Sequence, residues 1–136
     1  MTDIIKVLDK YSVRKDCLYT ENHEWVRKEG DIYIYGISDY AQQKLDALTF
    51  AEVPDEGSSF DKGEDMGFVE ALKTTEDYYA PFDCEVVEAN KDLEEDAEVI
   101  NDSPYEDGWI VKIKALGEVE GLLSAEDYVE FIKNNE

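Results

Sequence analysis

Turn signals divide this chain of 136 residues into short segments, and this division restricts the fold more than any other feature of the sequence. Gly30-Asp31 separates two strand-like runs, residues 24–29 and 32–37, as a two-residue β-hairpin would. Pro54-Asp55-Glu56-Gly57 is a strong turn signal that ends a third run at residues 49–53. Further strands are expected at residues 66–72, 76–80, 85–90 and 109–114. Many short strands with frequent turns predict a mainly β fold, a compact barrel or sandwich.

Short helices are expected at three places in this pattern. Ser38 is positioned to cap an amphipathic helix over residues 39–48, and Ser124 opens a capping-box-like start for a C-terminal helix. At the other end, apolar residues recur at helical spacing at Ile4, Ile5, Leu8 and Tyr11. We therefore expect residues 1–16 to be an N-terminal extension, a short helix or a mobile arm, ahead of a domain at residues 17–136. Residues 91–107 are expected to form an acidic loop.

The formal net charge of -22 restricts the partners of the chain. It argues against nucleic acid and against anionic membrane surfaces, and it favours transient docking to basic patches. An acidic surface selected for solubility in high salt is compatible with the same charge. No apolar run approaches the length of a transmembrane helix, and the first residues lack the features of a signal peptide. A cytoplasmic location is the expectation.

The residue types that usually carry catalysis are sparse and scattered. His23 is the only histidine, and we expect it to be a packed, hydrogen-bonded residue at a strand end rather than a catalytic base. The two cysteines, Cys17 and Cys84, have no metal-binding spacing and are expected to be free thiols. Cys84 follows Asp83 at a turn-like position, where it could be exposed. The chain is therefore predicted to be a non-catalytic scaffold without a metal site.

Lys73 is the one residue whose position suggests a chemical role. It interrupts an apolar stretch, with residues 66–72 before it and residues 76–80 after it. A cation in such a position is best explained by a tight hairpin tip that presents it to solvent. A single presented amine is suited to covalent attachment of another group.

The chain resembles the H protein of the glycine cleavage system, and the resemblance covers nearly everything after residue 17. The blocks that carry it are Leu18-Tyr19-Thr20, His23-Glu24-Trp25-Val26-Arg27, Gly36-Ile37-Ser38-Asp39-Tyr40-Ala41-Gln42, Val69-Glu70-Ala71-Leu72-Lys73, Tyr79-Ala80-Pro81, Glu85-Val86-Val87-Glu88-Ala89-Asn90 and Ser103-Pro104-Tyr105-Glu106-Asp107-Gly108-Trp109. So many blocks in the family's order make this resemblance far more specific than the lysine alone.

The resemblance implies a flattened β-barrel or sandwich of two sheets, of the lipoyl-domain type, with Lys73 at a hairpin tip. It implies that a lipoate ligase or a lipoyl or octanoyl transferase attaches lipoate to Lys73. It also implies that Glu70, three residues earlier, helps the modifying enzyme to recognise the site. The cofactor would carry the redox and group-transfer chemistry, while the protein supplies its position.

In the function that the resemblance implies, the lipoyl arm shuttles an aminomethyl group. The arm would visit glycine decarboxylase, aminomethyltransferase and dihydrolipoyl dehydrogenase in turn, and could fold back onto the carrier. Glu24 and Asp77 match acidic positions of the cleft that would receive the loaded arm, where a carboxylate could hold the aminomethyl cation. Ordinary surface charge is the alternative interpretation for both.

Several residues depart from the family pattern. The sequence around the lysine is Ala71-Leu72-Lys73-Thr74 instead of Ser-Val-Lys-Ala, and Cys84 and Asp46 replace common glycines. Lys44 occupies a cleft-side position that is histidine in some members. These departures leave a second hypothesis open: an H-like lipoate-binding protein that carries sulfur intermediates for a heterodisulfide-reductase-like sulfur-oxidising complex. A third is an unmodified β-rich interaction module. The sequence does not decide which pathway an arm would serve, or the oligomeric state.

Overall fold

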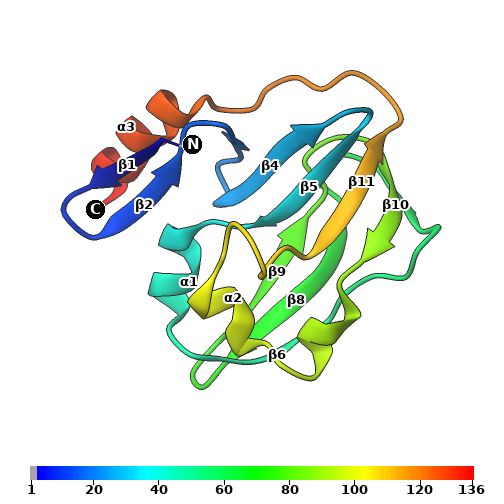
Figure 1. The fold of residues 1–136 in the computed structure, drawn as a ribbon, viewed down its shortest axis with the longest axis horizontal. Helices are drawn as coiled ribbons and strands as arrows, with labels where there is room; N and C mark the ends of the chain where they lie inside the picture. Colours follow the sequence, from blue (N-terminus) through cyan, green and yellow to red (C-terminus); the bar gives the residue numbers. More distant parts are fainter. Residues whose placement is uncertain (1–2) are drawn as a thin grey trace.

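The computed structural model describes residues 3–136, and this part of the chain forms three antiparallel sheets (Figure 1). The largest sheet has the order β3 (Leu18–Tyr19), β4 (Glu24–Glu29), β5 (Ile32–Ile37), β11 (Val111–Ala115), β10 (Cys84–Ala89) and β7 (Ser59–Phe60). A second sheet has the order β6 (Leu48–Ala51), β8 (Asp65–Ala71) and β9 (Thr75–Tyr79). The smallest pairs β1 (Ile4–Val7) with β2 (Tyr11–Arg14).

The six-stranded and three-stranded sheets pack on each other through one hydrophobic core. Val26 and Tyr35 come from the larger sheet, and Val69 and Tyr78 from the smaller one, and all four are buried in the same cluster. Burying a large apolar side chain contributes about 1.5–3 kcal/mol, so this shared core is the main reason that the sheets stay together. The expected mainly β fold of two sheets is confirmed, in the form of a flattened sandwich without a closed barrel.

The N-terminal segment is a β-hairpin, so the expected short helix or mobile arm is wrong for the described part of residues 1–16. Leu8 and Asp9 adopt positive φ angles of 54° and 57° and turn the chain between β1 and β2. Met1 and Thr2 lie outside the described residues. The placing of a domain boundary at residue 17 stays a prediction.

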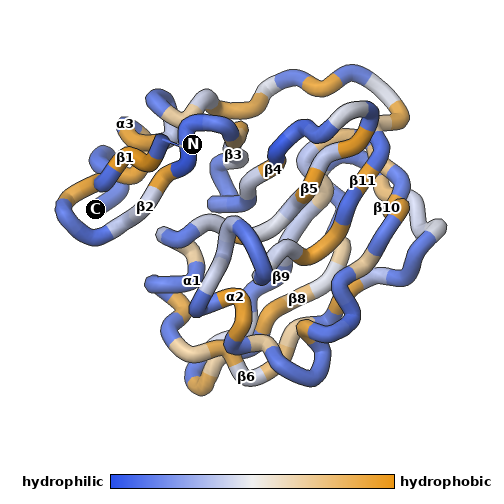
Figure 2. Tube along the Cα trace, in the orientation of Figure 1, coloured by the Kyte–Doolittle hydropathy of each residue, from blue (hydrophilic) through white to orange (hydrophobic). Residues whose placement is uncertain are grey.

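A second hydrophobic cluster explains why this segment prefers strands. Val7, Tyr11 and Val13 of the hairpin are buried together with Tyr128 and Ile132 of α3 (Ala125–Asn135). Figure 1 shows the hairpin beside α3, and Figure 2 shows apolar segments on both elements. In a strand, alternate residues face the same side, which places Tyr11 and Val13 together on the buried face. The helical spacing was therefore overridden by packing between distant parts of the chain.

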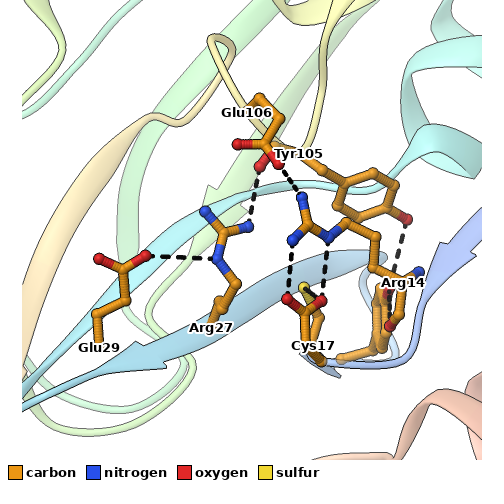
Figure 3. A network of polar contacts seen from close by, with 8 residues as sticks. Arg14, Cys17, Arg27, Glu29, Tyr105 and Glu106 are labelled. Carbon is orange, nitrogen blue, oxygen red and sulfur yellow. Dashed lines mark hydrogen bonds and ion pairs between the residues drawn. The ribbon is translucent and has the colours of Figure 1, made fainter. Parts of the chain in front are cut away.

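A polar network joins the hairpin to the segment before β11 (Figure 3). The guanidinium of Arg14 pairs with the carboxylates of Asp16 and Glu106. Arg27 on β4 donates a hydrogen bond from Nη1 to the carbonyl oxygen of Tyr105, at 2.9 Å. The Arg14–Glu106 contact joins residues 92 positions apart in sequence, and the Arg27–Tyr105 contact joins residues 78 positions apart.

The helices begin where their caps predict. The Ser38 hydroxyl accepts a hydrogen bond from the Ala41 N–H and starts α1 (Asp39–Leu45), and Ser124 accepts one from the Asp127 N–H and starts α3. The first helix ends three residues earlier than expected, because Asp46 leaves helical geometry at φ 66° and ψ -153°. The expected acidic loop contains two short helices, η1 (Lys91–Glu94) and α2 (Glu98–Asp102). Their formation follows from burial of the apolar residues between the acids, Leu93, Ala97 and Ile100.

No helix in the described part of the chain is both long enough and apolar enough to cross a membrane.

Candidate functional site

Lys73 lies at the tip of the hairpin between β8 and β9, as the sequence predicted. Glu70 pairs with Thr75 as the last residues of the ladder, and the Ala71 N–H donates to the Thr74 carbonyl at 2.8 Å to close the turn. Lys73 is exposed, and its neighbour Leu72 is 83% exposed. Within residues 3–136, Lys73 makes no ion pair. The hairpin therefore presents this amine to solvent without another residue competing for it.

A cleft of about 330 Å³ opens beside this hairpin. Its walls come from α1, from the hairpin of β8 and β9, from the end of β5, and from the turn that leads into β4 with the first residue of that strand. Tyr40 and Lys44 contribute from α1, Thr74 and Glu76 from the hairpin, and His23 from the turn. The volume falls within the usual range for small-molecule sites, and the walls combine apolar side chains with a few charged ones, as such sites do.

Glu24 lines the cleft and connects the six-stranded and three-stranded sheets. Its side chain accepts a hydrogen bond from the Tyr79 N–H on β9 at 2.7 Å and another from the Thr20 hydroxyl at 2.8 Å. Only 2% of the residue is exposed. Burial raises the pKa of the Glu24 carboxyl above its ordinary value of 4.5, and the two hydrogen bonds oppose that shift. The predicted cleft position is therefore occupied by an acid whose oxygens already have protein partners.

Asp77 and Glu76 are the exposed acids of the cleft. Asp77 is a residue that the sequence placed there. In the ladder it lies opposite Phe68, and its carboxylate, together with burial, raises the pKa of Asp65. Sequence reasoning missed Glu76, which lies opposite Val69, another cleft residue. Strand alternation was the available signal, because Glu76 lies on the same side of β9 as the buried Tyr78.

His23 lies in the cleft wall, with its ring held by aromatic neighbours. Its Nδ1 atom is 2.9 Å from the hydroxyl of Tyr128, and its ring centroid is 4.5 Å from that of Tyr40. Burial lowers the pKa of His23 below 6.5, which favours the neutral imidazole. The packed, hydrogen-bonded histidine expected from the sequence is confirmed, although its position in the cleft was not foreseen.

A second hollow, of about 280 Å³, lies between the C-terminal end of α1 and the hairpin tip. Its lining includes Lys73 and Leu72, and it shares Lys44, Leu45 and Thr74 with the larger cleft. The two hollows therefore adjoin, and a flexible group attached to Lys73 has a continuous surface to follow into the cleft. Lys44 stands where they meet.

Glu70 lies on the hairpin strand that leads to Lys73, outside the cleft lining. It is exposed and pairs across the sheet with Phe50 on β6 and Thr75 on β9. The structure thus separates the four predicted site residues into two groups. Lys73 and Glu70 are on the exposed part of the hairpin, and Glu24 and Asp77 line the cleft.

Cys84 is fully buried, so the expectation that it could be exposed is wrong. It lies in the ladder between β10 and β11, where it pairs with Ala115. Burial raises the pKa of its thiol to about 12, which keeps the sulfur protonated and unreactive near neutral pH. Cys17 is buried as well, and both thiols are free. The thiol that favoured a sulfur-carrying pathway is therefore inaccessible. In the described residues no cluster of three histidine, cysteine or acidic side chains could hold a metal ion.

The exposed amine and the adjoining cleft suit a covalently attached arm. The Lys73 Nζ atom is available for amide formation, and a chain attached there can reach the cleft along the second hollow. The exposed carboxylates of Glu76 and Asp77 could then stabilise a positive charge at the end of such an arm.

Comparisons with known proteins agree with this geometry. The family model described as "Glycine cleavage H-protein" matches residues 17–135. The chain is 44% identical over 119 residues to the glycine cleavage system H protein of Listeria monocytogenes serotype 4a, covering 86% of this chain and 95% of that protein. It is 48% identical over 120 residues to the protein of the same name from Alteromonas mediterranea, covering 86% and 93%. A crystal structure of a glycine cleavage system H protein from Mycobacterium marinum superimposes with a TM-score of 0.80 at 32% identity, covering 89% of this chain and 97% of that one.

Proposed function

The chain belongs to the glycine cleavage H-protein family, and on that premise we propose that it is a lipoyl carrier with lipoate attached as an amide to Nζ of Lys73. The observation that carries the proposal is the exposed amine at the tip of the β8–β9 hairpin, next to a cleft that its attached group could enter. The residues fit the cofactor, because Lys73 has no competing ion pair among the described residues and the adjoining hollows are large enough for a slender arm.

When bound, lipoate supplies a pair of sulfur atoms that carries an aminomethyl group and passes between disulfide and dithiol. Every other contribution comes from the chain. The short turn from Ala71 to Thr74 limits where the attachment point can move, while the exposed tip lets partner enzymes reach it. Tethering also keeps the carried group at high effective concentration near each partner site.

The cleft residues would protect the carried group between partners. Glu24 would contribute a buried carboxylate to the cleft wall and link the two sheets through the Tyr79 N–H. Asp77 and Glu76 would attract a cationic amine, and the aromatic wall of Tyr40 and His23 would limit the access of water. The proposed partners are a lipoate ligase or a lipoyl or octanoyl transferase, then glycine decarboxylase, aminomethyltransferase and dihydrolipoyl dehydrogenase.

Intact mass spectrometry tests the attachment. The chain is incubated with lipoate, ATP and a lipoate ligase, and the mass is expected to rise by one lipoyl amide. Lys73→Arg keeps the positive charge and should abolish the increase. Lys28→Arg is a matched control, because Lys28 is also exposed and lies next to a hairpin turn. A mass increase that persists in Lys73→Arg, or that is absent from the unaltered chain, would contradict the proposal.

The pathway needs a separate assay. The lipoylated chain is offered to a glycine decarboxylase, and exchange of labelled carbon dioxide into glycine is measured. We expect exchange to rise above a control that contains the same chain without lipoate. Attachment without any rise in exchange would leave a lipoyl carrier whose pathway is not glycine cleavage.

A further inference from the structure

Lys44 is a cation at the junction of the two hollows beside Lys73. It lines both the cleft and the second hollow, so an arm that leads from Lys73 to the cleft passes it. Glu76 and Asp77 line the same cleft. The Lys44 ammonium could compete with a cationic amine on the arm for those two carboxylates. It would compete effectively, because it is attached to the protein and stays at a fixed high local concentration.

In the structure, Lys44 forms an ion pair with Glu136 instead. Its Nζ atom is 2.8 Å from Oε2 of Glu136, the residue that follows α3. The hydroxyl of Tyr40 donates to the same oxygen at 2.8 Å, and the hydroxyl of Tyr11 donates to Oε1 at 3.3 Å. The Glu136 side chain is only 22% exposed. Three donors from two elements, Lys44 and Tyr40 on α1 and Tyr11 on β2, thus hold this carboxylate in one orientation.

The four residues of this contact network, Tyr11, Tyr40, Lys44 and Glu136, do not all lie in the region that the family model matches. Lys44 and Tyr40 belong to the region that the family model matches, whereas Tyr11 and Glu136 lie outside residues 17–135. The N-terminal hairpin contributes the tyrosine, whose ring packs edge-on against Tyr40 at 4.7 Å between centroids. The segment that seemed separate in the sequence is therefore connected to the wall of the cleft.

We propose that Glu136 is a positioning residue for the cleft: by pairing with Lys44, it keeps that ammonium away from Glu76 and Asp77, which remain available to a cationic amine. The proposal rests on the proposed function for its purpose, because it assumes that the arm carries such an amine. Its physical basis does not depend on the arm. When an acid neutralises a fixed cation of the cleft wall, that cation no longer offsets the negative charge of Glu76 and Asp77, so a mobile cation is favoured there.

The first experiment uses the chain without lipoate and measures the pKa values of the Glu76 and Asp77 carboxyls by NMR. In Glu136→Gln, the freed Lys44 should pair with at least one of these carboxylates, and the measured value for that carboxyl should fall, because a nearby ammonium favours the ionised form. Glu136→Gln combined with Lys44→Gln should restore the original value. Glu130→Gln is the matched control, since it removes an exposed acid from α3, the helix that Glu136 follows, and Glu130 forms no ion pair with Lys44 among the described residues.

Each outcome of this experiment decides the question. A fall in pKa that the second substitution reverses supports the positioning role. Unchanged values in Glu136→Gln would overturn it, and so would a fall that persists in the double variant, because Lys44 would not be the mediator. If Glu136 only stabilised the end of α3, removing Lys44 would not reverse the pKa change caused by Glu136→Gln.

The second experiment uses the lipoylated chain loaded with the aminomethyl group. Water slowly converts the loaded thiol to free thiol, formaldehyde and ammonia, and the ammonia is measured over time. Glu136→Gln should hydrolyse at least ~3-fold faster than Glu130→Gln, which corresponds to a modest loss of electrostatic attraction, and the added Lys44→Gln should restore the slower rate. Equal rates would overturn the protective role. Failure to load the unaltered chain would instead count against the proposed function, while the NMR result would still decide the role of Glu136.

Discussion

The carboxylate of Glu24 on β4 accepts a hydrogen bond from the backbone N–H of Tyr79 on β9, at 2.7 Å. The two residues are 55 positions apart, and the bond joins the six-stranded sheet to the three-stranded sheet. Glu24 is therefore a structural residue of the cleft as well as a candidate for binding a cation. Its two roles can be separated, because one depends on accepting hydrogen bonds and the other on negative charge.

Glu24→Ala should lower the free energy of unfolding by about 1–3 kcal/mol, the usual cost of leaving a buried donor unsatisfied. The donor concerned is the Tyr79 N–H. Glu24→Gln should cost less, because its carbonyl oxygen can still accept one of the bonds. Urea denaturation of the chain without lipoate measures both. An alanine variant as stable as the unaltered chain would mean that the bond between the sheets is not important for stability.

The pH dependence of the stability of the unaltered chain, compared with that of Glu24→Gln, provides a second test. Burial raises the pKa of Glu24 in the folded state, so its contribution to stability is full below 4.5 and is lost as the pH rises through the folded-state pKa. The stability of the unaltered chain should therefore fall relative to Glu24→Gln across that window. Unfolding free energies measured from pH 4 to pH 7, about the range of interest, check this. A constant difference between the two proteins would show that the carboxyl does not titrate abnormally.

His23 should titrate below its ordinary value of 6.5, because burial disfavours the imidazolium. It is the only histidine, so its ring proton signals in an NMR titration need no assignment. The lowered pKa means that its contribution to stability is full above 6.5 and is lost as the pH falls through the folded-state pKa. His23→Gln should lack this component. A titration midpoint at or above 6.5 would contradict the buried environment that the ring contacts indicate.

Asp46→Gly should stabilise the chain by about 1 kcal/mol. Asp46 has φ 66° and ψ -153°, a conformation that favours glycine and costs other residues about 1–3 kcal/mol. Part of the gain is offset by the greater freedom of glycine in the unfolded chain. Asp46→Ala is the matched control, because it removes the carboxylate but keeps the Cβ atom and the strain. Thermal unfolding that ranks alanine equal to glycine would show that charge, and not backbone strain, decides this position.

Glu70→Gln should slow lipoylation on the order of 10-fold, the effect of losing one charge-assisted hydrogen bond to the modifying enzyme. Initial rates from intact mass measure it. Glu76→Gln is the matched control: it lies three residues after Lys73, as Glu70 lies three residues before it, but it lines the cleft. Equal lipoylation rates for the two variants would mean that the modifying enzyme does not recognise Glu70.

Local rules predicted the elements whose residues interact with near neighbours. The strands at residues 24–29 and 32–37 agree with the structure residue for residue, because a two-residue turn and strand alternation are both short-range properties. Ser38 and Ser124 likewise capped the helices that they predicted. The exposed position of Lys73 followed from the same reasoning, since a hairpin tip is defined by the strands on either side of it.

Where local rules failed, a distant part of the chain was responsible. The first residues form a hairpin because Val7, Tyr11 and Val13 are buried with α3, more than a hundred residues later in the sequence. Cys84 is buried because β10 lies inside the six-stranded sheet, between β7 and β11. Neither outcome can be derived from the neighbouring residues alone.

The sequence by itself determined the β-rich class, the hairpin of residues 24–37 and the lysine that a second hairpin presents. Only the tertiary structure decided which charges surround that lysine: that Glu24 is held by Tyr79, and that Lys44 is paired with Glu136. The physical reason is that turns and alternation depend on residues a few positions apart. A cleft instead depends on how separate sheets and helices pack, so its electrostatics come from residues that the chain brings together only on folding.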